Sequence, residues 1–134
     1  MKTALKIIFS LLLVFSVKLN LAQVDAIPYY HNLNFRDAFF VIAESDAKSN
    51  YYAVNLSSFN SEAEKIYFEK LAFDQPALIR INSGNNNIAW FRVKKLNPTA
   101  ETKELLMSLK SQATSFFSGM SEEQKRNWLT LNKK

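Results

Sequence analysis

The chain has 134 residues, with 17 basic and 12 acidic side chains, 48% hydrophobic residues and no cysteine. Without cysteine it can form no disulfide bond and carry no lipid on an N-terminal cysteine. The high content of apolar and aromatic residues argues against disorder, and the length suits one domain.

The first 22 residues are typical of a secretory signal peptide. They combine three lysines and no acidic residue with the apolar run IIFSLLLVFSV at 7–17, which is too short to cross a bilayer of about 30 Å. Cleavage is expected after Ala22, with Ala26 as the alternative. We therefore expect an exported, soluble protein, secreted or periplasmic, with no membrane span once the signal is removed.

The charge of the exported part is small. Residues 23–134 hold 14 basic and 12 acidic side chains, a net charge of +2 against +5 for the whole chain. Much of the alkaline pI therefore belongs to the signal, and the charge is no argument for a nucleic acid partner.

Residues 23–36 are predicted to form an extended N-terminal arm in front of a single α+β domain at 37–134. The arm, QVDAIPYYHNLNFR, lacks clear periodicity but carries aromatic side chains that can pack onto the domain. The domain opens with DAFFVIAE at 37–44 and NYYAVNL at 50–56. Both segments are rich in aromatic and β-branched residues and flank a polar turn, so they predict a first β-hairpin.

Two capping boxes mark the starts of helices. Ser61 with Glu64 predicts a helix at 62–73, and Ser121 with Gln124 predicts a short C-terminal helix. In a capping box each side chain bonds a backbone N–H of the other residue, which satisfies donors that the first helical turn leaves unpaired.

A longer helix is predicted between these two. Asn97 as N-cap and Pro98 as first helical residue lead into TAETKELLMSLKSQATSFFSG at 99–119. Leucine, alanine and phenylalanine recur on one side of this segment, which makes one helix face apolar. Gly119 is suited to end the helix in a left-handed conformation.

The predicted order is ββαββα, followed by the short C-terminal helix. The natural arrangement is a two-layer α+β domain, a four-stranded antiparallel sheet with both main helices on one face. The first six elements also superpose on themselves at an offset of 38 residues, which pairs Tyr52 with Trp90. Identity over this alignment is at chance level, so we infer a repeated architecture and not a duplication.

The second hairpin, within RINSGNNNIAWFRVKK at 80–95, can pair in two registers. In one, Ile81 lies opposite Trp90 and each face mixes polar with apolar residues. In the other, Gly84 lies opposite Ile88 across a loop at 85–87, and one face becomes wholly apolar, with Ile79, Ile81, Ala89, Phe91 and Val93. A buried face selects the second register, and the asparagines are then explained as turn residues.

This register predicts an outer sheet face, away from the helices, that carries Trp90, Arg80 and Arg92, with Tyr52 at the matching place in the first hairpin. Its other members are Leu78, Ile88, Lys94, Phe40, Ile42 and Val54. A sheet face this apolar needs a cover. The cover is either the C-terminal helix with Trp128, the N-terminal arm with its aromatics including Phe35, or another molecule.

If another molecule covers it, the outer face is a binding surface. Trp90 and Tyr52 would supply stacking surfaces, and Arg80 and Arg92 would supply polar anchors. A protein or a glycan would be the partner.

Catalytic, metal and cofactor sites cannot be assembled from the sequence. His31 is the single histidine, and no G-x-S-x-G nucleophile motif occurs. No cofactor motif is present, so we expect no cofactor and no metal. The acids Glu44, Asp46 and Asp74 could in principle supply a glycosidase pair, but their positions next to turns explain them.

The sequence therefore predicts a small exported, non-enzymatic domain that acts by binding, with another protein as the first choice of partner. The alternative is a small secreted or periplasmic hydrolase that acts on glycan through carboxylates the sequence does not place.

Overall fold

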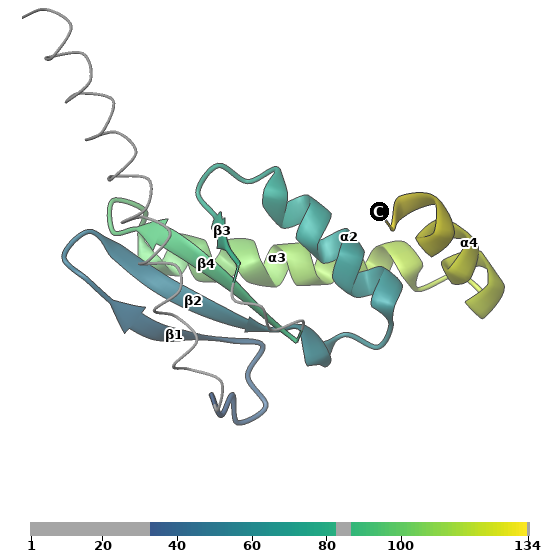
Figure 1. The fold of residues 1–134 in the computed structure, drawn as a ribbon, viewed down its shortest axis with the longest axis horizontal. Helices are drawn as coiled ribbons and strands as arrows, with labels where there is room; N and C mark the ends of the chain where they lie inside the picture. The colour runs from purple at the N-terminus through teal and green to yellow at the C-terminus, as the bar shows by residue number, and fades with distance from the viewer. Residues whose placement is uncertain (1–32, 83–86, 134) are drawn as a thin grey trace, which may run out of the picture.

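The computed structural model describes residues 33–82 and 87–133, which form a four-stranded antiparallel sheet and a layer of helices (Figure 1). The strands are β1 (Phe40–Ser45), β2 (Ser49–Asn55), β3 (Ile79–Ile81) and β4 (Ile88–Lys94). The helices are α2 (Glu62–Phe73), α3 (Thr99–Phe117) and α4 (Glu122–Asn132), with a 3-10 turn, η2 (Leu56–Ser58), after β2. The predicted α+β class is confirmed. The predicted signal peptide and residues 23–32 of the arm lie outside the described residues.

The strand order across the sheet is β1-β2-β4-β3, with every neighbouring pair antiparallel. The two hairpins therefore meet at the centre through β2 and β4, whose pairing runs from Ser49 opposite Lys94 to Asn55 opposite Ile88. The register of β1 with β2 shifts between Ile42 and Glu44.

The helices begin close to the predicted residues. Ser121 and Gln124 form the complete capping box, with backbone-to-side-chain distances of 3.2 and 2.8 Å. At α2, the Ser61 hydroxyl accepts a hydrogen bond from the Glu64 N–H at 3.3 Å, but the Glu64 carboxylate accepts from the N–H of Asn60 at 3.4 Å. The second bond of this capping box therefore goes to the N–H of Asn60 and not to that of Ser61.

The start of α3 also differs by one residue from the prediction. Pro98, not Asn97, is the N-cap, and its extended backbone with ψ of 140° places Thr99 as the first helical residue. The helix ends at Phe117, before Gly119.

The main core lies between one face of the sheet and two helices. It unites strand residues Tyr52, Val54, Ala89, Phe91 and Val93 with Phe68 and Ala72 of α2 and Leu106, Leu109 and Ala113 of α3. Phe39, which precedes β1, meets Phe59 and Phe68 edge to face at 5.6 and 5.5 Å between ring centroids. Buried aliphatic and aromatic area of this size is the main source of stability in a chain without disulfides.

The predicted register of the second hairpin is wrong. Ile81 lies opposite Trp90 and Arg80 opposite Phe91, which is the register with mixed polar and apolar faces. Trp90 does face away from the helices, as predicted, but Ile81 lies on its side of the sheet, and Arg80 lies on the helix side beside Phe91. Residues 83–86, between the two strands, lie outside the described residues.

The faces assigned to the first hairpin are also wrong. Tyr52 lies opposite Phe91, and Val54 opposite Ala89, so both point into the helix-side core together with the partly buried Phe40. The offset of 38 residues therefore pairs side chains from opposite faces. The physical reason for both errors is that both faces of this sheet are buried, so no single buried face selects a register.

Residues of the N-terminal arm pack against the apolar centre of the outer face. Ala53, Ile81, Ile88 and Trp90 form a second apolar cluster, and Leu33 and Phe35 pack against it. The chain enters β1 through a tight turn in which the Ala38 N–H bonds the Phe35 carbonyl at 2.9 Å. Arg36 and Asp37 hold φ angles of 47° and 67° in this turn, a conformation that costs about 1 kcal/mol or more per residue.

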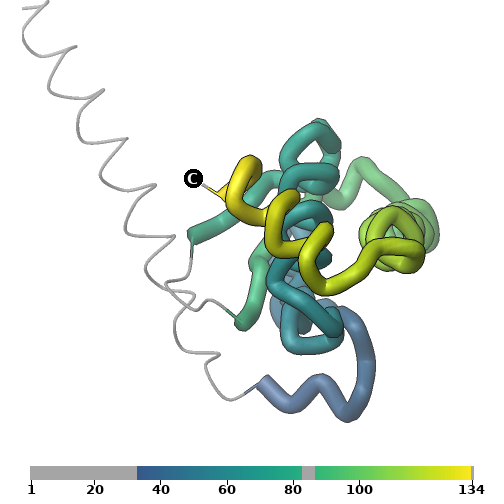
Figure 2. Tube along the Cα trace, turned by 90° about the vertical axis from the view of Figure 1, so that its right-hand side faces the viewer, coloured from purple at the N-terminus to yellow at the C-terminus, as the bar shows by residue number. Residues whose placement is uncertain are grey.

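The C-terminal helix does not cover the sheet, so that alternative is wrong. α4 packs against α2 in the helix layer, as Figure 2 shows from the side. Trp128 meets the rings of Tyr67, Phe116 and Phe117 at centroid distances of 5.8, 6.3 and 4.9 Å. This aromatic cluster attaches α4 to the domain.

We expect Trp128→Ala to lower the free energy of unfolding by about 2 kcal/mol, because a half-buried indole loses its ring contacts. Leu131→Ala is the matched control, since Leu131 is on the same helix and 81% exposed. Chemical denaturation measures both variants. An unchanged stability in Trp128→Ala would show that α4 is not held by this cluster.

The hydroxyl of Tyr52 is buried in the core without a hydrogen-bond partner in the described part of the chain. We therefore expect Tyr52→Phe to raise the free energy of unfolding by about 1 kcal/mol, because it removes an unsatisfied buried polar group. Tyr51→Phe should instead lower it slightly, because the Tyr51 hydroxyl donates to Asp46 at 2.9 Å. Denaturant titration distinguishes the two, and a loss of stability in Tyr52→Phe would contradict the expectation.

Candidate functional site

The four residues of the predicted binding face are not brought together. Trp90 lies on the outer face but is only 3% exposed, and Tyr52 is wholly buried on the helix side. Arg92 is exposed on the outer face, opposite Ile79 and Tyr51. Arg80 lies on the helix side with Tyr52, so the four residues are divided between the two faces of the sheet.

Arg80 has structural contacts that account for its position. Its guanidinium forms a 3.0 Å ion pair with Glu69 of α2 and lies 5.6 Å from the centroid of the Phe91 ring. It also donates to the Ile81 carbonyl at 2.6 Å. Arg80 therefore ties the short edge strand β3 to helix α2.

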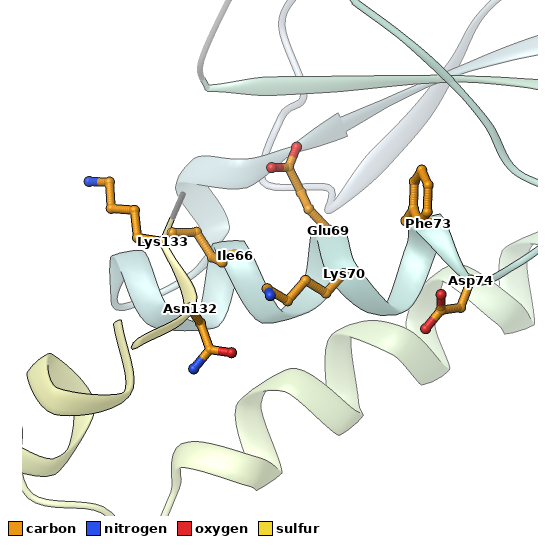
Figure 3. Close-up of a pocket in the computed structure, with 7 residues that line it drawn as sticks. All are labelled: Ile66, Glu69, Lys70, Phe73, Asp74, Asn132 and Lys133. Atoms are coloured by element: carbon orange, nitrogen blue, oxygen red, sulfur yellow. The ribbon is translucent and has the colours of Figure 1, made fainter. Parts of the chain in front are cut away.

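A groove of about 870 Å³ runs along the surface of α2. Its residues on this helix are Ile66, Glu69, Lys70 and Phe73, spaced so that they form one stripe on the helix surface, with Asp74 at its end. Asn132 and Lys133 at the end of α4 complete it near Ile66 (Figure 3). The apolar ends of this stripe are Ile66 and Phe73.

Phe73 is the most unusual side chain of the groove because it is 83% exposed. Buried Phe side chains in this fold form the core, whereas Phe73 occupies the last turn of α2, beyond the part of the helix that the end of α4 reaches (Figure 3). An aromatic ring left in water at the mouth of a groove is available for a contact with another molecule.

The groove also contains two acids, Glu69 and Asp74, which do not form a catalytic pair. They project to different sides of α2 (Figure 3). Glu69 is bonded to Arg80, and Asp74 is the C-cap residue of the helix. Neither geometry brings two carboxylates to face each other across a bond to be cleaved.

A second surface lies at the end of the sheet where the β1–β2 loop meets the segment after β4. Two adjoining hollows of about 560 and 370 Å³ share Ala47, Lys48, Ser49 and Arg92. The larger one is also lined by Lys94, Lys95 and Leu96. We call this surface the basic hollow, because its charged side chains are cationic except for Asp46 in the smaller hollow.

Asp46 organises the loop beside the basic hollow. One carboxylate oxygen accepts hydrogen bonds from the N–H groups of Lys48 and Ser49 at 2.8 and 2.7 Å, and the other accepts from the Tyr51 hydroxyl at 2.9 Å. The Lys48 N–H, followed by the Tyr51 hydroxyl and the Ser49 N–H, lowers the pKa of Asp46 below its usual 3.8. Burial, and then the bond to Asp46, raises the pKa of Tyr51.

Sequence reasoning missed most residues of both surfaces. Phe73 is the last residue of the helix predicted at 62–73 and was given no role, although Asp74 and Pro76 after it signal the end of that helix. Lys94 and Lys95 were included in the predicted hairpin at 80–95, and Leu96 after them was given no role. The sequence does carry a signal for this surface. An apolar residue follows two lysines and precedes the helix start at Pro98, where no core position is available.

Other kinds of site are not found in the described residues. Across 33–82 and 87–133, no three His, Asp or Glu side chains gather as metal ligands. His31 lies outside this part of the chain. None of the described helices is long and apolar enough to cross a membrane.

Comparison of the chain with known proteins gives no match to a family model, to a curated protein or to a solved structure. What its surfaces do must therefore be inferred from their own residues.

The hydrogen bonds of Asp46 predict an acid-sensitive contribution to stability. Because its pKa in the folded protein lies below 3.8, ionised Asp46 stabilises the fold at pH values above 3.8, and this contribution is lost as the pH falls through the lowered pKa. Asp46→Asn keeps an oxygen for the two N–H groups but cannot ionise. We expect the melting temperature of the wild type to exceed that of Asp46→Asn at neutral pH, with the difference shrinking below about pH 4. A difference that stays constant from pH 7 to about pH 2 would contradict this.

Proposed function

We propose that the protein is a small exported, non-enzymatic domain that binds another protein, and that the groove along α2 is its contact surface. The observation that carries the proposal is Phe73, an aromatic side chain 83% exposed at one end of a groove whose other end is Ile66. Exposed aromatic residues beside apolar grooves are typical centres of protein interfaces.

The chemistry of the groove suits a polypeptide segment with apolar side chains about two helical turns apart. Ile66 and Phe73 are seven residues apart, which is about 10 Å along the helix. The rim carries both charges, with Glu69 and Asp74 against Lys70 and Lys133. A mixed rim around apolar ends favours a protein partner over a polyanion or a glycan, which would need one sign of charge or a flat aromatic platform.

The groove supports this proposal better than the outer sheet face does. Trp90 is 3% exposed, and Leu33 and Phe35 lie against its cluster. A partner at that face would first have to displace these side chains, whereas Phe73 is accessible as it stands. The groove does not favour the glycan hydrolase alternative, because its two acids project to different sides of α2 (Figure 3).

We expect Phe73→Ala to abolish partner binding without unfolding the domain. The wild type and the variant, each immobilised, are exposed to the exported proteins of the native host, and the retained proteins are compared quantitatively. Leu96→Ala is the matched control, since Leu96 is 90% exposed and lies in the basic hollow, away from α2. A partner should be retained by the wild type and by Leu96→Ala, with at least a tenfold loss for Phe73→Ala.

The melting temperature of Phe73→Ala separates loss of binding from loss of fold. The melting temperature should change little, since little of this ring is buried, and the free energy of unfolding should stay within about 1 kcal/mol of the wild type. If a protein is retained equally by Phe73→Ala and the wild type, the groove is not the contact surface.

A further inference from the structure

The basic hollow combines four cations with an exposed leucine. Lys48, Arg92, Lys94 and Lys95 are all exposed, and each lines this surface. Leu96 lines it too and is 90% exposed, the highest value among the large apolar side chains described. The surface is therefore positive around one apolar side chain.

The cations of the basic hollow form no ion pair with another described residue. The ion pairs of the described residues join Lys65 to Glu62, Arg80 to Glu69 and Lys125 to Glu122, and none involves this surface. The acid beside it, Asp46, already accepts three hydrogen bonds from its own loop. Asp46 feels the positive charge of Lys95, but it is the only acid among the described residues that line the two hollows, so a net positive charge remains for an outside anion.

Backbone hydrogen bonds hold the two segments of this surface together. The Lys95 N–H bonds the Lys48 carbonyl at 2.9 Å, which joins the segment after β4 to the β1–β2 loop. The Asn97 N–H bonds the Lys94 carbonyl at 2.9 Å and closes a turn with Lys95 and Leu96 between them. The cations and the leucine are therefore presented by a fixed backbone, with little ordering cost on binding.

We propose that the basic hollow binds an anionic lipid surface, with Leu96 entering the headgroup region and the surrounding cations contacting lipid phosphates. The site is separate from the α2 groove and does not depend on the protein-binding role. A soluble anion would use the cations but would gain nothing from a leucine held in water. An anionic lipid surface uses both, because it offers negative charge above an apolar interior.

The expected strength follows from general values for such contacts. Each lysine or arginine near an anionic membrane strengthens binding about fivefold. The loss of two lysines should therefore weaken binding about 25-fold, and binding should also weaken with rising salt.

The absence of cysteine in the chain allows a local test. Leu96→Cys in the full chain is labelled with a polarity-sensitive dye and titrated with vesicles of phosphatidylglycerol and phosphatidylcholine, and with vesicles of phosphatidylcholine alone. We expect a blue shift with the anionic vesicles only. Leu131→Cys, labelled in the same way, is the positional control, because Leu131 is 81% exposed on α4, at the other end of the molecule from these loops (Figure 1).

Two double variants in the labelled Leu96→Cys protein test the role of charge. Lys94→Ser with Lys95→Ser should shift the titration midpoint about 25-fold. Lys125→Ser with Arg126→Ser makes the same change of charge on α4 and should shift it far less. Because every protein carries the same residues 1–22, binding by that segment is common to all and does not affect the comparison.

Several results would overturn the proposal. These are no blue shift at position 96 with anionic vesicles, an equal shift with neutral vesicles, or equal midpoints for the two double variants. If the label at position 96 shows no shift with vesicles but soluble polyphosphate binds at the hollow, the hollow is a site for a soluble anion. This result would also overturn the proposal.

Discussion

The pairing of β2 with β4 at the centre of the sheet is the constraint on which the rest of the domain depends. It sets Tyr52 opposite Phe91 and Ala53 opposite Trp90, and since side chains alternate along a strand, it decides the face of every residue in both strands. Each face then has an apolar centre that must be covered. α2 and α3 contribute to one cover, and Leu33 and Phe35 of the arm contribute to the other.

Local signals predicted much of this fold. α2 has the predicted bounds, and the capping box at Ser121 is complete, because these features depend on hydrogen bonds within a few residues. The register of β3 with β4 was not predicted, because it depends on contacts far apart in the chain. Arg80 was predicted on the outer face, but as part of an edge strand it lies on the helix side and reaches Glu69, eleven residues earlier on α2. The sequence left the arm as one of three possible covers of the outer face. Once that face is also buried, burial no longer distinguishes one register from the other.

The candidate surfaces were harder to predict than the core for a related reason. Trp90 and Tyr52 attracted attention as aromatic residues near arginines, yet aromatic residues in central strands are the material of the core. The two most exposed large apolar side chains of the described residues lie where elements end. Phe73 occupies the last turn of α2, and Leu96 lies between β4 and α3. A residue type shows what a surface could bind, but only the fold shows which residues the core has not used.

The irregular edges of the sheet bear on how the protein behaves at high concentration. An exposed, regular edge strand is a template for pairing with another chain, and thus for aggregation. At one edge, the pairing register of β1 shifts between Ile42 and Glu44, and Glu44 places a carboxylate just after the shift. At the opposite edge, β3 has only three residues. Neither edge offers a long run of evenly spaced backbone groups. A domain with so many aromatic and β-branched strand residues is in this way discouraged from extending its sheet into fibrils.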